Sequence, residues 1–288
     1  MSEFGESPIS YEEIKPELGP RTIDLLETDP QLKLCDPTRI LAALIHGVSR
    51  AIVMLPGALD MKPDEDTFKL AKKEGLSAVM VRYPIKPAFS LRGEVAGMLD
   101  YLEGSGTSEV DLVTGSYGGI PALMMMYSAF GEGGPGVKFR SFFAAKSALQ
   151  PSDLRSPLRK LAGASFALET VSKLPLSFIR GIRARVNAPN NEYPDESILK
   201  KIAEVPAMFI VPPGSGDFAV KITNTYNTYF PHAQVIEDSN ARKDLLGFVT
   251  WGHMSPRSEP GLRILQESFL KEPNNRLEQL PDGYKRIK

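Results

Sequence analysis

The chain has 288 residues, of which 42% are hydrophobic and 24% are charged, and its formal net charge is −1. This length allows one large domain or a core domain with an insertion, and the composition is not that of a disordered protein. The balanced charge argues against the basic surface by which proteins bind nucleic acid, so we expect no nucleic-acid partner.

The first residues are acidic and polar, without a basic region followed by an apolar one, so we expect no signal peptide. The longest apolar stretch, near 120–130, is too short to span a bilayer and predicts a buried helix. The single cysteine, Cys35, excludes an intramolecular disulfide and is typical of a small buried residue. Together these features predict a cytoplasmic protein without a membrane span.

Glycine and proline separate the predicted elements along the chain. Residues 1–49 predict an N-terminal arm with a short helix near 23–28 and a second helix that begins at Asp36-Pro37 and ends at Gly47. Strands and helices then alternate. The predicted strands are 50–55, 76–83, 110–113, 138–145, 207–211 and 233–237. The predicted helices are 64–73, 90–103, 118–130, 220–230 and 260–271.

Alternating apolar strands and helices predict an α/β fold: a mostly parallel, doubly wound sheet covered on both faces. Residues 50–146 and 204–271 form its core in this interpretation. Residues 147–203 are too long for an ordinary connection and predict a helical cap insertion. Residues 272–288 are polar and predict a loosely docked C-terminal tail.

Ser116 lies where a predicted strand runs directly into a predicted helix, in the segment Thr114-Gly115-Ser116-Tyr117-Gly118. In that context the pattern G-x-S-x-G forms a nucleophile elbow, a turn so tight that it needs small residues around the serine. Threonine at position 114 departs from the usual glycine. The alternative interpretation is an ordinary strand-to-helix turn with an exposed serine.

A serine hydroxyl needs a histidine as base, and the histidine needs a carboxylate to orient it. The chain has three histidines. His253 lies in a loop after the last predicted strand of the core, where it can reach back over the strand ends, and is the candidate base. His46 precedes the first predicted core strand, on the wrong side of the chain order for this role. His232 begins a strand, so a structural role is expected for it.

Asp217 is the candidate carboxylate, because it follows an apolar strand through a glycine-rich turn. It could also cap the helix predicted to begin near Val220, and both roles are compatible. Asp238, in the turn after another strand, is a possible substitute acid, and Asp153 in the insertion is a weaker one.

The order Ser116, Asp217, His253 is the order found in α/β-hydrolases, and over most of residues 50–271 the chain resembles the α/β-hydrolase fold superfamily. This resemblance implies an oxyanion hole made by the backbone N–H groups of Tyr117 and Ala58. Two departures are noted. Pro56-Gly57 stands where His-Gly is common, and residues 1–49 show no clear antiparallel hairpin, so the sheet is expected to be smaller than the usual eight strands.

These features predict a serine hydrolase with a Ser-His-Asp triad that cleaves an ester, thioester or lactone of a small acyl substrate. The resemblance implies neither a metal nor an organic cofactor. An acyltransferase or cyclase would use the same triad, and a non-catalytic binding protein of this fold is a further alternative. The insertion is basic in places, which fits either an anionic substrate or a solvated helix face, and the sequence leaves the oligomeric state open.

Overall fold

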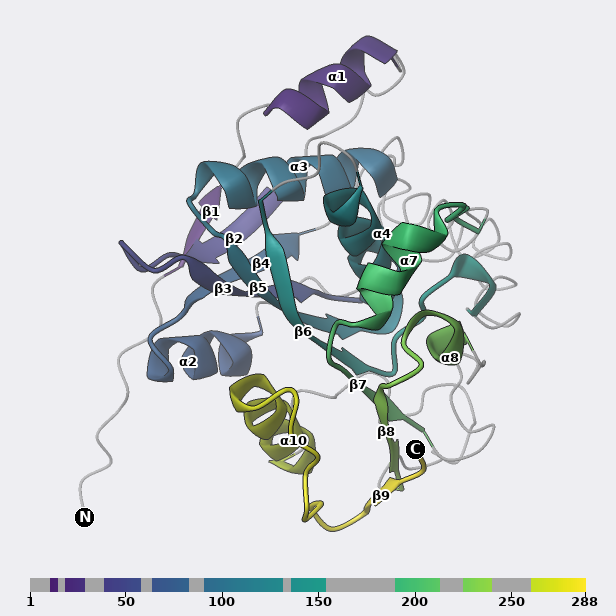
Figure 1. Ribbon diagram of the computed structural model, residues 1–288. Helices are drawn as coiled ribbons and strands as arrows, with labels where there is room; N and C mark the ends of the chain where they lie inside the picture. The colour runs from purple at the N-terminus through teal and green to yellow at the C-terminus, as the bar shows by residue number, and fades with distance from the viewer. Residues whose placement is uncertain are drawn as a thin grey trace, which may run out of the picture.

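A mixed β-sheet forms the centre of the molecule (Figure 1). The structure is a computed structural model, and it describes residues 11–14, 19–28, 39–57, 64–82, 91–131, 136–153, 190–212, 225–239 and 260–288. In these residues the sheet has nine strands, in the order β1-β2-β4-β3-β5-β6-β7-β8-β9. The strands are β1 (Glu12–Ile14), β2 (Arg39–Ala43), β3 (Arg50–Leu55), β4 (Ser77–Arg82), β5 (Glu109–Gly115), β6 (Lys138–Ala145), β7 (Ala207–Val211), β8 (Gln234–Asp238) and β9 (Tyr284–Arg286).

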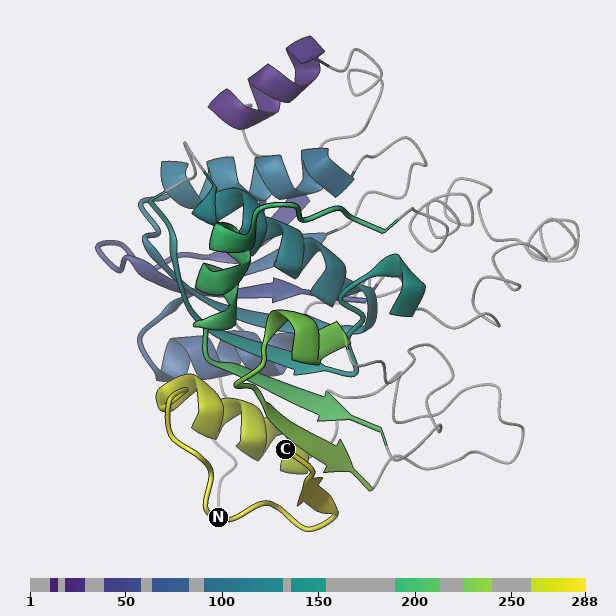
Figure 2. The same ribbon diagram turned by 45° about the vertical axis from the view of Figure 1, so that its right-hand side comes forward.

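Strands β3 to β8 are all parallel to their neighbours within that set, whereas β1, β2 and β9 pair antiparallel at the two sides of the sheet. The parallel strands read as continuous apolar runs, such as the five buried residues of β7, because both of their faces are covered. Their carboxyl ends therefore meet at one edge of the sheet, which we call the carboxyl edge. Figure 2 shows the parallel strand arrows pointing to this common side.

Helices cover both faces of the sheet (Figures 1 and 2). The helices are α1 (Pro20–Thr28), α2 (Glu65–Lys73), α3 (Leu91–Gly104), α4 (Gly119–Phe130), α7 (Glu196–Ala203), α8 (Thr225–Tyr229) and α10 (Pro260–Lys271). Residues of α3, α4 and α7 join one hydrophobic core, and residues of α2 and α10 join a second core on the opposite face. In the first core Phe142 packs against Phe209 and Phe230 at ring-centroid distances of 5.6 and 5.1 Å.

The core strands and helices predicted from the sequence are confirmed, except that the helix predicted at 220–230 is described only as α8, since residues 220–224 lie outside the described residues. The helix predicted from Asp36 to Gly47 is wrong. Residues 39–43 form strand β2, which pairs with β4 through Ile40↔Val81 and Leu41↔Met80. A short apolar run such as Ile40-Leu41-Ala42 fits either a helix or a strand. Here it forms a strand, because it pairs with β4 and both of its faces are buried. Because β1 pairs with β2, the antiparallel strands thought missing are present, and the expectation of a sheet with fewer than eight strands is also wrong.

The C-terminal segment is not a loosely docked tail. Strand β9 pairs antiparallel with β8, with Asp238↔Tyr284 in register, and the Tyr284 side chain is buried. The Lys288 carbonyl accepts a hydrogen bond from the Val235 N–H at 3.0 Å. Backbone pairing, which the polar sequence does not reveal, holds this segment.

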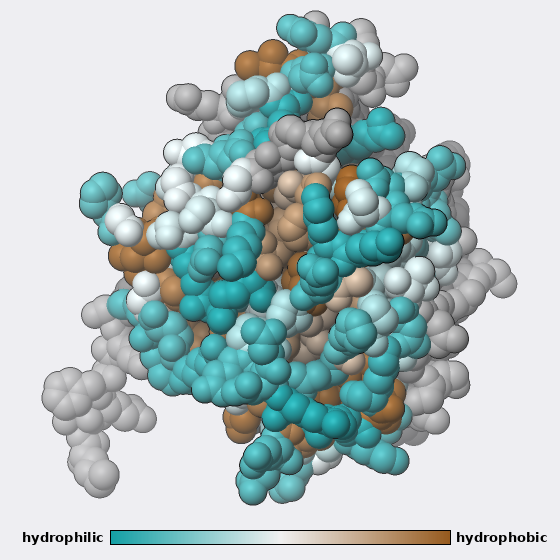
Figure 3. Space-filling view, viewed as in Figure 1, coloured by the Kyte–Doolittle hydropathy of each residue, from teal (hydrophilic) through white to brown (hydrophobic). Residues whose placement is uncertain are grey.

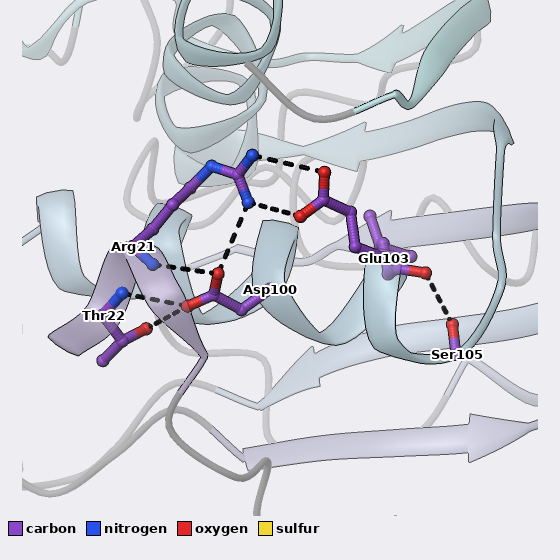
Figure 4. A network of polar contacts seen from close by, with 6 residues as sticks. Arg21, Thr22, Asp100, Glu103 and Ser105 are labelled. Carbon is purple, nitrogen blue, oxygen red and sulfur yellow. Dashed lines mark hydrogen bonds and ion pairs between the residues drawn. The ribbon is translucent and has the colours of Figure 1, made fainter. Parts of the chain in front are cut away.

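Helix α1 docks on α3 through a polar cap (Figure 4). The buried Asp100 carboxylate accepts hydrogen bonds from the backbone N–H groups of Arg21 and Thr22 at 3.2 and 2.9 Å, and from the Thr22 hydroxyl at 2.7 Å. A carboxylate of α3 thus satisfies N–H groups in the first turn of α1, which have no partner within their own helix. The Arg21 guanidinium also pairs with Glu103 at 2.7 Å.

The surface is mostly hydrophilic on the face drawn in Figure 3, with a hydrophobic patch at the top, over α1. Among the large hydrophobic side chains of α1, that of Ile23 is exposed. Within the described part of the chain, every helix is too short or too polar to cross a membrane.

Candidate active site

Ser116 occupies a strained turn at the carboxyl edge. It directly follows β5 and begins the 3-10 turn Ser116–Gly118, which runs into α4. Its φ is +50°, in the left-handed region that residues with a side chain rarely adopt. Such strain costs about 1–3 kcal/mol and persists where the surrounding structure enforces it, most often at functional sites. The geometry is that of a nucleophile elbow.

The two glycines after the turn are required by backbone packing. A Cβ at Gly118 would lie 1.8 Å from the Leu55 carbonyl oxygen, at the end of β3. A Cβ at Gly119 would lie 2.4 Å from the Ala148 carbonyl oxygen, beyond β6. The elbow is therefore held between the ends of the two strands that flank β5.

Thr114 departs from the glycine usual at its position, and the fold accommodates it. Its hydroxyl lies 2.9 Å from the Ser147 hydroxyl, and the Thr114 side chain is buried. The Ala148 N–H also donates a hydrogen bond to the Ser116 carbonyl at 2.8 Å. Both contacts tie the elbow to the segment after β6, so the threonine adds a link where a glycine would have none.

The segment after β3 passes beside Ser116. A Cβ at Gly57 would lie 3.1 Å from the Ser116 Cβ and 3.6 Å from its Oγ. This contact brings the segment predicted to supply an oxyanion amide next to Ser116, despite the departure at Pro56. Ala58, the predicted donor, lies outside the described residues, whereas Tyr117, the other donor, is buried in the turn.

Asp217 and His253 also lie outside the described residues, but the strands that lead to them are placed. β7, which precedes Asp217, and β8, which precedes His253, are the second and third strands from β5. Since neighbouring strands are spaced about 4.8 Å apart, the carboxyl ends of β7 and β8 lie roughly 10 and 14 Å from the end of β5. Both connecting segments leave from the edge that carries Ser116.

The other two histidines lie at the opposite end of the strands. His46 is exposed in the turn that precedes the amino end of β3, and His232 is exposed in the turn before β8. Neither can approach Ser116 across the length of the sheet. The structural role expected for His232 as the start of a strand is not supported, because it precedes the strand and faces solvent.

The substitute acids considered for the triad have other partners. Asp153 accepts hydrogen bonds from the Leu149 and Gln150 N–H groups at 3.0 and 2.9 Å and from the Thr225 hydroxyl at 2.7 Å. It therefore caps a turn. Asp238 forms a buried ion pair with Lys146, whose Nζ lies 2.8 Å from its Oδ2.

Lys146 was not singled out in the sequence. It follows β6 directly, has a φ of +51°, and donates its backbone N–H to the Ile210 carbonyl of β7 at 2.8 Å. Its side chain spans from the end of β6 to the end of β8, and both partners are buried. A lysine at the end of the apolar strand Phe142-Phe143-Ala144-Ala145 was the signal that could have drawn attention to it.

The predicted cap cannot be compared in full, because residues 154–189 lie outside the described residues. Residues 196–203 of the predicted range form α7, which packs against α4 and buries Ile198 and Ile202 in the first hydrophobic core. Among the described side chains there is no group of three or more His, Cys, Asp and Glu placed to hold a metal ion. Cys35 also falls outside the described residues.

No protein-family model and no curated protein matches the sequence. Similarity to solved structures is clear. An α/β hydrolase enzyme from a Medee basin deep-sea metagenome library is 14% identical, with 84% of this chain and 97% of that chain covered and a TM-score of 0.56. A homoserine O-acetyltransferase from Staphylococcus aureus is 12% identical, with 85% and 91% covered and a TM-score of 0.54.

At these identities the similarity establishes the fold. A mostly parallel sheet with helices on both faces, an elbow after β5 and structural neighbours of this kind together show that the chain has the α/β-hydrolase fold.

Proposed function

We propose that this protein is a serine hydrolase that cleaves a carboxylic ester, thioester or lactone through an acyl-enzyme on Ser116. The observation that carries the proposal is the strained φ of Ser116 in an elbow at the carboxyl edge, from which the segments bearing Asp217 and His253 also leave. The presence of all three residues argues against a non-catalytic binding protein. The single cysteine fits a reducing, cytoplasmic setting.

In the proposed mechanism the Ser116 hydroxyl attacks the substrate carbonyl while His253 takes its proton. Asp217 orients His253 and stabilises its cation. The N–H groups of Ala58 and Tyr117 stabilise the oxyanion, and each such donor typically contributes about 3–4 kcal/mol to the transition state. His253 then gives the proton to the leaving group, and water attacks the acyl-enzyme. No step uses a metal or an organic cofactor.

The same machinery would serve an acyltransferase if an alcohol, amine or thiol replaced water. The acetyltransferase among the structural neighbours shows that this fold accommodates such chemistry in another protein. Product analysis with added acceptors would separate the two reactions, because transfer gives a new ester, amide or thioester in place of the free acid.

The first test is the intact mass of the protein after incubation with a fluorophosphonate, which reacts covalently with activated serines. Wild type should gain one adduct and Ser116→Ala none. Ser147→Ala is the matched control, because this serine also lies at the carboxyl edge and contacts Thr114, yet it should leave the adduct intact. Absence of an adduct on wild type would contradict the proposal.

A further inference from the structure

A cavity of about 80 Å³ lies between the sheet and the helices α2 and α10, at the carboxyl edge. Its inner wall is apolar and comes from the strands, including Met54, Val113 and Phe143. Leu70 of α2 and Leu262 of α10 form the facing wall. Within an otherwise buried core, this is a hollow that apolar atoms could fill.

The cavity adjoins the nucleophile through glycines. Gly57 and Gly115 line it, and both are immediate neighbours of Ser116. Gly115 precedes Ser116 in the chain, and the Cβ position of Gly57 lies 3.6 Å from the Ser116 Oγ. Neither glycine carries a side chain that could stand between the serine and the cavity, which leaves room for a group bound to Ser116 to pass beside them.

Two polar bridges between the helices line the outer side of the cavity, which is partly open. The Arg263 guanidinium donates to Asp66 at 2.7 Å, and the Gln266 amide donates to the Thr67 hydroxyl at 2.9 Å. All four residues line the cavity. An occupant that enters beside Ser116 therefore meets apolar side chains first and a polar wall at the far end.

We propose that this cavity binds the acyl chain of the substrate and restricts it to short, unbranched chains of about two to six carbons. This inference rests on the proposed acyl-enzyme at Ser116. At about 15–30 Å³ for each water-sized group, a volume of about 80 Å³ accommodates about three to five such groups beyond the carbonyl carbon bound to Ser116. The apolar wall selects a hydrocarbon chain, and the polar bridges limit its length.

The test is a series of p-nitrophenyl esters from acetyl to decanoyl. For wild type, kcat/KM should be highest at four to six carbons and at least tenfold lower for decanoyl. Leu70→Phe should fill the cavity and lower kcat/KM for hexanoyl at least tenfold relative to acetyl, the size of effect that crowding by a single group can produce. The rate of fluorophosphonate labelling at Ser116 should stay unchanged, which shows that the nucleophile is intact.

A surface variant tests the outer wall without disturbing the core. Arg263→Ala removes the bridge to Asp66 and should raise the rate for octanoyl at least fivefold relative to butanoyl. Lys73→Ala is the matched control, because it breaks a bridge between the same helices, to Glu267 at 2.6 Å, that does not line the cavity. It should leave the chain-length preference unchanged.

Two results would overturn the inference: a kcat/KM that rises steadily to decanoyl, or a Leu70→Phe variant that slows acetyl and hexanoyl esters equally. Failure of the proposed function gives a different result, because wild type would then show neither labelling at Ser116 nor ester cleavage.

Discussion

A buried carboxylate lies at each end of the parallel strands: one at the carboxyl edge, and one at the opposite side, where the strands begin, which we call the amino edge. The partners of the two carboxylates differ. At the amino end of β5, Asp111 accepts hydrogen bonds from Arg50 at 2.7 Å and Arg140 at 3.0 Å, and also from the Ser141 hydroxyl. At the carboxyl edge, Asp238 is paired with the ammonium group of Lys146 at 2.8 Å. Both carboxylates are almost fully inaccessible to solvent.

The surroundings of the two carboxylates suggest different roles. Arg50 and Arg140 also donate to the Leu270 carbonyl, so Asp111 joins three strands and the end of α10. This cluster lies five residues along β5 from Ser116, roughly 17 Å at the usual strand rise. The Lys146–Asp238 pair joins the strand ends on either side of β7, where the segments bearing the proposed acid and base begin. We expect the amino edge to govern stability and the carboxyl edge to govern chemistry.

The sharpest comparison between the edges uses the three histidines. His253→Ala should lower the rate of fluorophosphonate labelling roughly 10⁵-fold to 10⁶-fold, the loss typical when the base of a triad is removed. His46→Ala and His232→Ala should leave the rate unchanged, because both side chains are exposed at the amino ends of the strands. A slow His232→Ala variant with a normal His253→Ala variant would break the comparison.

The second prediction concerns stability at the amino edge. Asp111→Ala leaves two arginines without their buried partner and should lower the free energy of unfolding by about 3–5 kcal/mol, measured by urea denaturation. Glu109→Ala is the control on the same strand, since its pair with Lys138 is exposed and 3.8 Å long, and it should cost less than about 1 kcal/mol. Labelling of the folded Asp111→Ala variant should match wild type. Strongly reduced labelling would contradict the assignment of this edge to stability.

The third prediction concerns the carboxyl edge, where we expect a variant to keep its stability but lose reactivity at Ser116. The double variant Lys146→Met/Asp238→Leu replaces a buried ion pair by apolar side chains, an exchange that is often neutral or stabilising. We expect its free energy of unfolding to stay within about 1–2 kcal/mol of wild type. Labelling of Ser116 should fall by as much as about 100-fold, because shifts near 1 Å in supporting segments can have this effect. A variant as reactive as wild type would show that the pair only fills space.

Patterning along the sequence predicts the central part of this fold well. β3 and β7 follow from their largely continuous apolar residues, and Ser116 follows from the strand–turn–helix context of its glycines. β2 and β9 do not, because their assignment depends on partners distant in the chain: β4 for one, and β8 for the other. The Lys146–Asp238 pair could not be predicted from the sequence for the same reason, because its residues are 92 positions apart and meet only across the sheet.

The prediction with the smallest expected effect asks whether burial or the number of arginine partners determines how much a carboxylate stabilises the fold. Glu13 also lies between two arginines, with Arg39 at 2.9 Å and Arg82 at 2.5 Å, but its side chain is about one-third exposed. The hydrogen bond from Arg39 lowers the pKa of Glu13 below its ordinary value of 4.5, and the charge of Arg82 contributes in the same direction. Because the folded pKa lies below the unfolded one, the stabilisation is present above about pH 4.5 and is lost as the pH falls through the folded pKa.

Glu13→Gln should therefore cost less than about 1 kcal/mol at pH 7, and the difference from wild type should disappear in more acidic solution. Urea unfolding at several pH values measures this, with Glu12→Gln as a control on the opposite face of β1. If Glu13→Gln instead lowered the free energy of unfolding as much as Asp111→Ala, two arginine partners would be enough to make a carboxylate strongly stabilising without burial. We expect the two losses to differ by several kcal/mol because the Asp111 cluster is removed from water. Removing Asp111 leaves the charges of Arg50 and Arg140 without a partner, and solvent reaches these charges only in part.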